Sequence, residues 1–382
     1  RPVGSWNGDV AVIPASTNKL LVAGAAVEIL GAEYRFSTSI VAATPVNGVI
    51  DGDLALVGGG DPLLTTADRP NDSNAPSVSA ATSLEVLADA VVASGVTSIS
   101  GAVVGDARRY DDEFVNPAWG SGVAYLEVGP IGGLVVNDGR TAGQWSRQRD
   151  PGEAAARELW RLLRDRNVEV GGGWRAGAAD TGSPTIVTVE SAPLAVIVGD
   201  MLVRSDNDTA EMLVKEIGLA TVGEGTTTAG LRALALTVEA WGVGMQRVVF
   251  VDGSGLSAGN KLTCDALITV LQHLSDNSPV DQLAVAGRSG TLIDEFLGTA
   301  VEGRLMAKTG TLRNLPTGVD PPEVKALAGY LDAPSDETVE FVLVLNGAGY
   351  VTADGYRPFW DALAERLASF PAVPDDVVLG PR

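Results

Sequence analysis

The sequence predicts an α/β protein of the α+β type, in which helices flank an antiparallel sheet and a second domain is inserted into the chain. Three features predict this fold: an apolar helix near the start, three strand-like runs with short links near the end, and a closing amphipathic helix. They lie at residues 20–30, at 303–310, 325–332 and 338–346, and at 354–370. We therefore expect residues 1–42 and 189–382 to form one domain, with residues 43–188 inserted into it.

The first helix is predicted to begin near Ser16 and to end at Gly31. A hydroxyl residue is typical of a helix start, and glycine is typical of a helix stop. The stretch between Lys19 and Gly31 is apolar on almost all sides, which indicates a buried helix. The residues before it, 8–15, are predicted to form a short strand.

The middle of the chain is predicted to contain short strands and long loops. The strands are expected at 36–57, with a turn at Asn47-Gly48, at 97–104 and at 184–190. The stretches 65–82 and 111–145 are rich in turn-forming residues, so we expect loops there.

Three helices are predicted in the same region. Thr82 and Glu85 have the spacing of a capping box, which predicts a helix that runs to Ser94. Asp150-Pro151 is typical of the start of a second helix. An apolar run predicts a third helix at 192–203.

The composition excludes several classes of function. Acidic residues outnumber basic ones by 48 to 27, and a surface with a formal charge of −21 repels nucleic acid. The chain has one cysteine, Cys264, and one histidine, His273, so it cannot form an intrachain disulfide, a thiol-rich metal site or a multi-histidine site. We therefore expect no nucleic-acid partner, no metal and no cofactor. No apolar run reaches the roughly 18 residues that would indicate a transmembrane segment.

Ser16 and Lys19 are the first candidates for chemistry. Residues three apart share one face of a helix, so the hydroxyl and the amine can be neighbours. A helix start also leaves backbone N–H groups that can hold an oxyanion. An amine in an apolar setting has a lowered pKa and can act as a base. Taken alone, the pair is better explained by an N-cap serine and a lysine that reaches the surface.

The second candidate group is Lys308 with Thr309, Gly310 and Thr311, at the end of a strand-like run. A strand-end cation beside two hydroxyls can bind a carboxylate, and the glycine lets a substrate approach the strand. An ordinary exposed strand end explains the pattern equally well.

The third group is Ser205-Asp206-Asn207, which lies between two apolar helical runs. Its serine and asparagine can face one cleft. The same triplet at Ser275-Asp276-Asn277 is better explained as the end of a helix.

In order, the three groups are Ser-x-x-Lys, Ser-Asp-Asn and Lys-Thr-Gly, the set typical of penicillin-binding proteins and serine β-lactamases. The sequence resembles the D-alanyl-D-alanine carboxypeptidases of peptidase family S13, the type-4 class C penicillin-binding proteins. The stretches that carry the resemblance are PASTNKLL (14–21), LVGGGDPLL (56–64), DGSGLSAGNKLT (252–263) and AKTGTL (307–312). The long separation of Ser16 from Ser205 fits the insertion typical of that family.

This resemblance implies a penicillin-binding fold with a helical subdomain and an inserted domain. It implies a serine DD-peptidase that cleaves the terminal D-Ala-D-Ala bond of peptidoglycan stem peptides and that β-lactams inhibit covalently. A DD-endopeptidase activity is compatible with the same site. The insertion is shorter than in well-known members, so we expect a third subdomain to be reduced or missing.

The resemblance also implies roles for single residues. Ser16 would be the nucleophile, Lys19 the base, kept neutral by burial and by Lys308, and Ser205 the relay of a proton to the leaving amine. Asn207 would hold the substrate amide.

The strand would bind the terminal carboxylate through Lys308, Thr309 and Thr311. The backbone N–H groups of Ser16 and Thr311 would form the oxyanion hole. Asp106 and Tyr110 are candidates for binding the amino group of a diaminopimelate-type side chain, and a strand-end turn explains them at least as well.

Two other functions stay open, a β-lactamase and a non-catalytic scaffold with the same fold. A nucleophile elbow at Gly255–Gly259 is a weaker hypothesis, because a glycine-rich stretch separates Ser257 from its strand and His273 follows too soon. We expect Ser257 in an ordered loop and His273 on a helix. Residues 1–7 do not have the pattern of a signal peptide, and a substrate in the cell wall implies an extracytoplasmic protein, in the envelope or secreted.

Overall fold

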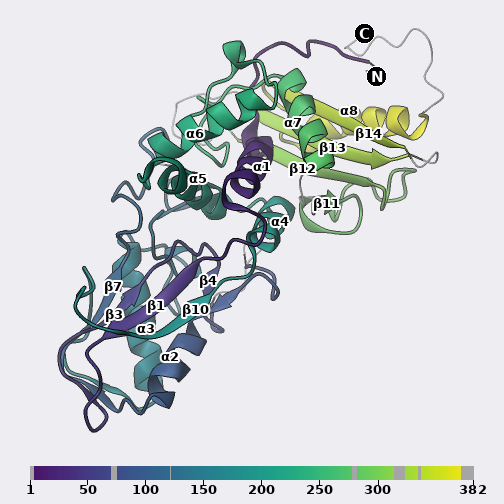
Figure 1. Ribbon diagram of the computed structural model, residues 1–382. Helices are drawn as coiled ribbons and strands as arrows, with labels where there is room; N and C mark the ends of the chain where they lie inside the picture. Colours follow the sequence, from purple (N-terminus) through teal and green to yellow (C-terminus); the bar gives the residue numbers. More distant parts are fainter. Residues whose placement is uncertain are drawn as a thin grey trace. The chain divides into compact units, whose positions relative to one another are not determined.

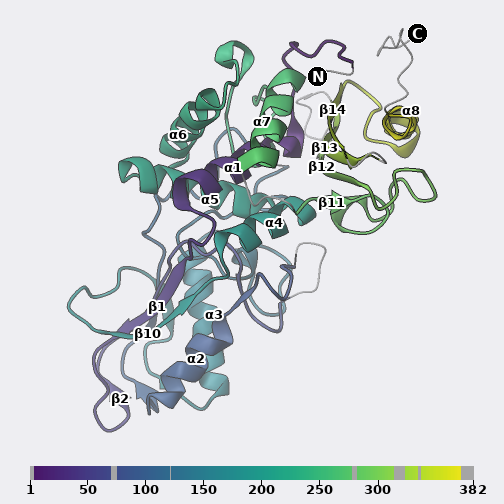
Figure 2. The same cartoon turned by 45° about the vertical axis from the view of Figure 1, so that its right-hand side comes forward.

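The computed structural model of the chain describes residues 4–69, 75–120, 122–277, 282–313, 323–333 and 337–370. It divides into two compact units (Figures 1 and 2). The first unit comprises Arg1–Glu28, Met201–Asp206 and Leu231–Arg382, and the second comprises Ile29–Asp200 and Asn207–Gly230.

The first unit contains a four-stranded antiparallel sheet of order β11-β12-β13-β14. Its strands are β11 (Ala284–Val285), β12 (Leu305–Leu312), β13 (Val324–Asp332) and β14 (Thr338–Asn346). The last three form the predicted meander, in which Lys308 lies opposite Ala328 and Ala328 lies opposite Val342. The prediction of an antiparallel sheet near the end of the chain is therefore confirmed.

Helices cover both faces of this sheet. On one face, Trp360 of α8 (Ala353–Ala368) shares an apolar core cluster with Leu327 and Leu331 of β13. On the other face, the Tyr330 hydroxyl donates to the carbonyl of Leu271 in α7 (Cys264–Asn277) at 2.6 Å. Successive side chains of a strand point to opposite faces, so residues 327 and 331 contact one helix and residue 330 the other. Figure 2 shows α7 and α8 on the two sides of the strands.

The N-terminal helix begins with a 3-10 turn, η1 (Ala15–Asn18), and continues as α1 (Lys19–Leu30). It is buried as far as Val27, and Gly31 ends it with a φ of 91°. The strand predicted at 8–15 is reduced to a single antiparallel bridge, between Val12 and Leu262. The side-chain amide of Asn346 bonds both the N–H and the C=O of Ile13, so these backbone groups have no strand partner.

The second unit contains a five-stranded sheet of order β10-β1-β3-β7-β9. Its strands are β1 (Ser37–Ala42), β3 (Leu54–Val57), β7 (Val103–Asp106), β9 (Trp174–Ala176) and β10 (Thr185–Glu190). β1 is antiparallel to both neighbours, and β3, β7 and β9 are parallel. In two smaller parallel sheets, β6 (Ser98–Ile99) pairs with both β2 (Val49–Ile50) and β8 (Glu169–Val170), and β4 (Leu64–Thr65) pairs with β5 (Thr82–Ser83).

Two helices, α2 (Leu84–Ala93) and α3 (Pro151–Asp165), share the apolar core of this unit with the sheet. α3 begins at Asp150-Pro151 as predicted, and the Asp150 side chain caps it by accepting from the Glu153 N–H at 3.0 Å. The capping box predicted at Thr82 is wrong. α2 begins two residues later, and Glu85 accepts instead from the Ser83 hydroxyl and the Ala67 N–H.

The remaining helices are α4 (Leu194–Arg204), α5 (Asn207–Val222) and α6 (Thr227–Ala240), with short 3-10 turns η2 (Asn137–Gly139), η3 (Met245–Arg247) and η4 (Gly290–Leu292). Among the described residues, no helix combines the length and the apolar character of a membrane span. Residues 4–28 and 337–370 belong to the first unit, and the inserted domain at 43–188 with its reduced third subdomain stays a prediction.

Candidate active site

The turn before α1 exposes one hydroxyl. The chain enters η1 through Ala15, whose φ of 49° is left-handed. Ala15, Thr17 and Asn18 are buried, whereas Ser16 is partly exposed. The helix that follows is anchored in the interior by Lys19, which is fully buried. Ser16 is thus the residue of this turn that a substrate can reach.

The amine of Lys19 lies between a hydroxyl and a carbonyl. Its Nζ is 2.9 Å from Ser16 Oγ and 2.7 Å from the carbonyl oxygen of Ser254. The predicted neighbourhood of Ser16 and Lys19 is therefore confirmed. The amine is within reach of the serine proton, which is the geometry that a general base needs.

The carboxylate of Asp252 organises the loop that supplies this carbonyl. It accepts hydrogen bonds from the N–H groups of Gly255 and Ser257, at 2.8 and 2.6 Å, and from the side chain of Asn260 at 2.7 Å. Because both carboxylate oxygens are used, the loop has a fixed shape. That shape holds the Ser254 carbonyl against Lys19.

The same loop touches the turn that carries Ser16. Gly255 has a φ of 85°, and a Cβ built on it would lie 1.9 Å from the carbonyl oxygen of Ala15. Only glycine has both the conformation and the room that this approach requires. Asn18 adds two hydrogen bonds of 3.0 Å, to the carbonyls of Asp252 and Gly253.

The rival residues have the places that we expected. Ser257 lies in the loop organised by Asp252 and is 6% exposed. His273 lies on α7, where its ring stacks on Trp241 and its Nε2 is 3.2 Å from a carboxylate oxygen of Glu28.

Lys308 of β12 is a second buried amine of this site. Its Nζ donates to the carbonyl of Thr309 at 2.7 Å. Burial, and then the charge of Lys19, hold the pKa of Lys308 well below its usual range. The two lysines therefore influence each other electrostatically.

The three residues after Lys308 differ in their neighbours. Gly310 lies near the Ser16 turn, and the hydroxyls of Thr309 and Thr311 are hydrogen-bonded to other side chains. A Cβ on Gly310 would lie 2.9 Å from the carbonyl oxygen of Pro14, so β12 passes close to the residues before Ser16. The Thr309 hydroxyl is bonded to Thr291 at 2.8 Å, and Lys325 donates to the Thr311 hydroxyl at 3.2 Å.

Ser205 follows the end of α4, in the same unit as Ser16. Its φ of 65° is left-handed, and its side chain is partly exposed. The end of α4 contacts η4, because a Cβ on Gly290 would lie 2.4 Å from the carbonyl oxygen of Val203. η4 also carries Thr291, the partner of Thr309.

The other predicted residues belong to the second unit. Asn207 begins α5, and its Nδ2 donates to the carbonyl of Glu127 at 2.8 Å. Tyr110 is buried, with its hydroxyl 2.8 Å from Glu216, and burial raises its pKa well above the usual value.

Asp106 ends β7 in the same unit. Burial would raise its pKa, but hydrogen bonds from Arg108 and from the Ala179 N–H outweigh that effect and lower it. The role of Asp106 and Tyr110 in binding an amino group stays a prediction.

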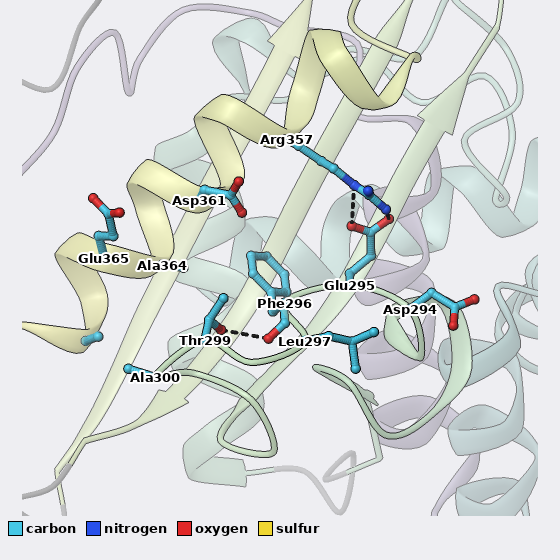
Figure 3. A pocket seen from close by; sticks show the side chains of 11 residues that line it. Asp294, Glu295, Phe296, Leu297, Thr299, Ala300, Arg357, Asp361, Ala364 and Glu365 are labelled. Atoms are coloured by element: carbon cyan, nitrogen blue, oxygen red, sulfur yellow. Dashed lines mark hydrogen bonds and ion pairs between the residues drawn. The ribbon is translucent and has the colours of Figure 1, made fainter.

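A separate acidic groove of about 490 Å³ lies in the first unit, between α8 and residues 294–300 (Figure 3). Its carboxylates come from Asp294, Glu295, Asp361 and Glu365. Arg357 is paired with Glu295 at 3.3 Å. The groove contains none of the predicted site residues. Within the described parts of the chain, no cluster of His, Cys, Asp and Glu side chains is suited to a metal ion.

Sequence reasoning does not single out three groups that support the candidate site: the side chain of Asp252, the carbonyl of Ser254 and the hydroxyl of Thr291. The first two lie in the stretch 252–263, which the family resemblance singles out. Thr291 stands in no motif, and no sequence signal marks it.

The chain is similar to known carboxypeptidases and to a penicillin-binding protein. A model of the D-Ala-D-Ala carboxypeptidase 3 (S13) family matches residues 1–154 and 128–368. A carboxypeptidase of Mycobacterium tuberculosis is 31% identical over 373 residues, which cover 94% of this chain and 76% of that protein. A D-alanyl-D-alanine carboxypeptidase of Actinomadura sp. is 30% identical over 454 residues, which cover 96% and 78%.

Among solved structures, penicillin binding protein 4 of Haemophilus influenzae matches with a TM-score of 0.76 and 19% identity, over 94% of this chain and 93% of that one. The same protein has also been solved in complex with a β-lactam. The match confirms the penicillin-binding fold expected from the sequence.

Proposed function

Because the chain belongs to the D-Ala-D-Ala carboxypeptidase 3 (S13) family and is a serine-type DD-peptidase, we propose that Ser16 is its nucleophile. We further propose that its substrate is the D-Ala-D-Ala end of a peptidoglycan stem peptide. The observation that carries the proposal is the 2.9 Å contact between the Ser16 hydroxyl and the buried amine of Lys19.

The reaction has two halves. Ser16 Oγ attacks the carbonyl carbon of the penultimate D-Ala while Lys19 takes the hydroxyl proton, and the tetrahedral intermediate expels the terminal D-Ala as its amine receives a proton through Ser205. Water then attacks the ester carbonyl, and the proton it loses returns to Ser16 Oγ. Free peptide and free D-Ala are the products.

Binding is assigned to the groups that flank this chemistry. Lys308, Thr309 and Thr311 bind the terminal carboxylate, with Gly310 leaving room for the peptide, and Asn207 holds the substrate amide. The backbone N–H groups of Ser16 and Thr311 stabilise the oxyanion. Since stem peptides belong to the cell wall, we expect the protein to act outside the cytoplasm, in the envelope or after secretion.

Labelling with benzylpenicillin tests the assignment of Ser16. The protein is incubated with the antibiotic and digested, and the acylated peptide is identified by mass spectrometry. We expect the adduct on Ser16, no adduct in Ser16→Ala, and normal labelling in the matched control Ser257→Ala. An adduct on Ser257 or Ser205, or active protein without an adduct, would overturn the proposal.

Two measurements on the same samples distinguish the proposed peptidase from a β-lactamase and from a non-catalytic scaffold. A β-lactamase would hydrolyse nitrocefin with fast turnover, whereas we expect a slowly hydrolysed acyl-enzyme. A non-catalytic scaffold would release no D-Ala from a D-Ala-D-Ala peptide, whereas we expect release that stops in Ser16→Ala.

A further inference from the structure

A buried ion pair lies at the first turn of α5, directly beside Asn207. Asp208 Oδ2 lies 2.6 Å from a guanidinium nitrogen of Arg147, and the two side chains are 3% and 2% exposed. The N–H of Gly129 donates to Asp208 Oδ1 at 2.6 Å, and Arg147 also donates to the Gly129 carbonyl at 2.9 Å. Gly129, Arg147 and Asp208 therefore form a closed ring of hydrogen bonds, which we name the clamp.

The clamp and Asn207 meet on one loop. Asn207 Nδ2 donates to the carbonyl of Glu127, two residues before Gly129. The clamp thus fixes the backbone at Gly129, and this backbone fixes the Asn207 side chain at Glu127. A carboxamide held through its NH₂ group has a set orientation, and this orientation determines where its oxygen points.

Stability is a weak explanation for such a pair. Removing two charges from water costs about as much as their attraction returns, so an apolar pair of similar volume is often as stable. The ion pair instead fixes orientation, because a planar guanidinium donates hydrogen bonds only along the directions of its N–H bonds. Its hydrogen bonds with Gly129 converge on the loop that orients Asn207.

We propose that Arg147 and Asp208 are positioning residues for the peptidase reaction. They hold residues 127–129 so that Asn207 presents its carboxamide to the substrate amide, and they act through Asn207 rather than on the reacting atoms. The inference rests on the role proposed above for Asn207.

A double-mutant cycle tests the clamp. Arg147→Leu is made in the wild type and in Asn207→Ala, and kcat/KM is measured with a D-Ala-D-Ala peptide. In the wild type we expect a loss of about 10- to 100-fold, the cost of a small misplacement of a substrate-binding group. In Asn207→Ala the same change should cost less than about twofold, because the group it positions is gone. Equal losses in both backgrounds would overturn the proposal.

Controls distinguish the possible failures. Arg69→Leu breaks another buried ion pair of the same unit, Arg69 with Asp138, and we expect it to lower Tm without the loss of kcat/KM. If Arg147→Leu does not fold, Arg147→Lys enters the same cycle, with a smaller loss that again disappears in Asn207→Ala. Full activity of Asn207→Ala would refute the proposed role of Asn207 and the clamp with it. An impaired Asn207→Ala with an undiminished Arg147 effect would refute the clamp alone.

Discussion

Lys308 shows how one side chain opposes stability in this site. It is fully buried, and burial and the charge of Lys19 lower its pKa. Between that lowered pKa and the unfolded value of about 10.4, the unfolded chain binds more protons, so this contribution to stability rises with pH. We expect Lys308→Met to raise Tm by a few degrees at pH 7, since 1 kcal/mol is worth roughly 2–4 °C for a domain of roughly 150–250 residues. The gain should shrink toward pH 10, as thermal melts over this range will show.

Lys215 is the matched control for this prediction. It is buried to the same degree, but its amine is 2.5 Å from the carboxylate of Asp111. Lys215→Met leaves that carboxylate without its cation, so we expect Tm to fall at pH 7. A rise in both variants would contradict the explanation given for Lys308.

Lys308→Met should also lose recognition of the substrate carboxylate. A charge-assisted hydrogen bond is worth roughly 1.5–3 kcal/mol, so kcat/KM should fall by about 10- to 150-fold. The control is a peptide amidated at its C-terminus, which the wild type should reject strongly and the variant much less. Removing the positive neighbour also makes protonation of Lys19 easier, so the acid limb of the pH–rate profile should move to higher pH. Unchanged discrimination against the amide would rule out this role.

Prediction of single residues from sequence succeeds where the contact is local. Ser16 and Lys19 are three residues apart, and helix geometry alone brings them together. The carbonyl of Ser254 comes from a residue 235 positions away from Lys19. Every residue type has such a carbonyl, so no pattern of side chains can identify it.

At the scale of elements, the contact between the 252–263 loop and η1 decides whether Ser16 is correctly placed. Gly255→Ala adds a methyl group 1.9 Å from the Ala15 carbonyl oxygen, at a φ of 85°. We expect a loss of stability of more than about 2 kcal/mol and acylation by benzylpenicillin slowed at least tenfold, because η1 must move. Melting and stopped-flow acylation measure the two effects.

Substitution of Gly242 is the control that separates the strain of a left-handed backbone from the clash at Gly255. The φ of Gly242 is 93°, but a Cβ there would meet nothing within 4 Å. Gly242→Ala should therefore cost roughly 1–2 kcal/mol for the left-handed backbone and leave acylation unchanged. Acylation at the wild-type rate in Gly255→Ala would show that the loop does not position Ser16.

Helices and strands could be predicted where the hydrophobic periodicity and the residues that end an element lie within that element. The meander, α1, α3 and α8 follow from such patterns. The strand expected at 8–15 does not extend beyond the bridge of Val12 with Leu262, because the side chain of Asn346 bonds the backbone groups of Ile13. The capping box at Thr82 fails because Glu85 bonds Ser83 and Ala67 instead. In both cases, another group forms the hydrogen bond that the pattern assigned to a neighbour. A strand partner loses the Ile13 backbone to Asn346, and Thr82 loses the Glu85 carboxylate to Ser83 and Ala67.

The whole molecule carries a formal charge of −21, which opposes compaction. Salt weakens single ion pairs as well, but with 48 acidic against 27 basic residues repulsion is the larger effect. Raising NaCl from 0.01 to 1 M shortens the screening length from about 30 to about 3 Å. We expect Tm at pH 7 to rise over this range and the rise to shrink near the isoelectric point of about 4.4. A fall in Tm with salt at pH 7 would mean that attractive pairs dominate.

The contacts around Ser16 also have consequences for the order in which the chain is made. Ile13 is bonded to Asn346, and Lys19 to Ser254, so the turn that carries Ser16 leaves the ribosome long before its partners are synthesised. The sheet of the second unit is complete once β10 has been synthesised, so we expect that unit to fold first. A product terminated shortly before Asn346 would keep Ser16, Lys19 and most of its length, and we expect it to lack a correctly placed Ser16. Late nonsense mutations should therefore inactivate the enzyme as thoroughly as the loss of Ser16 itself.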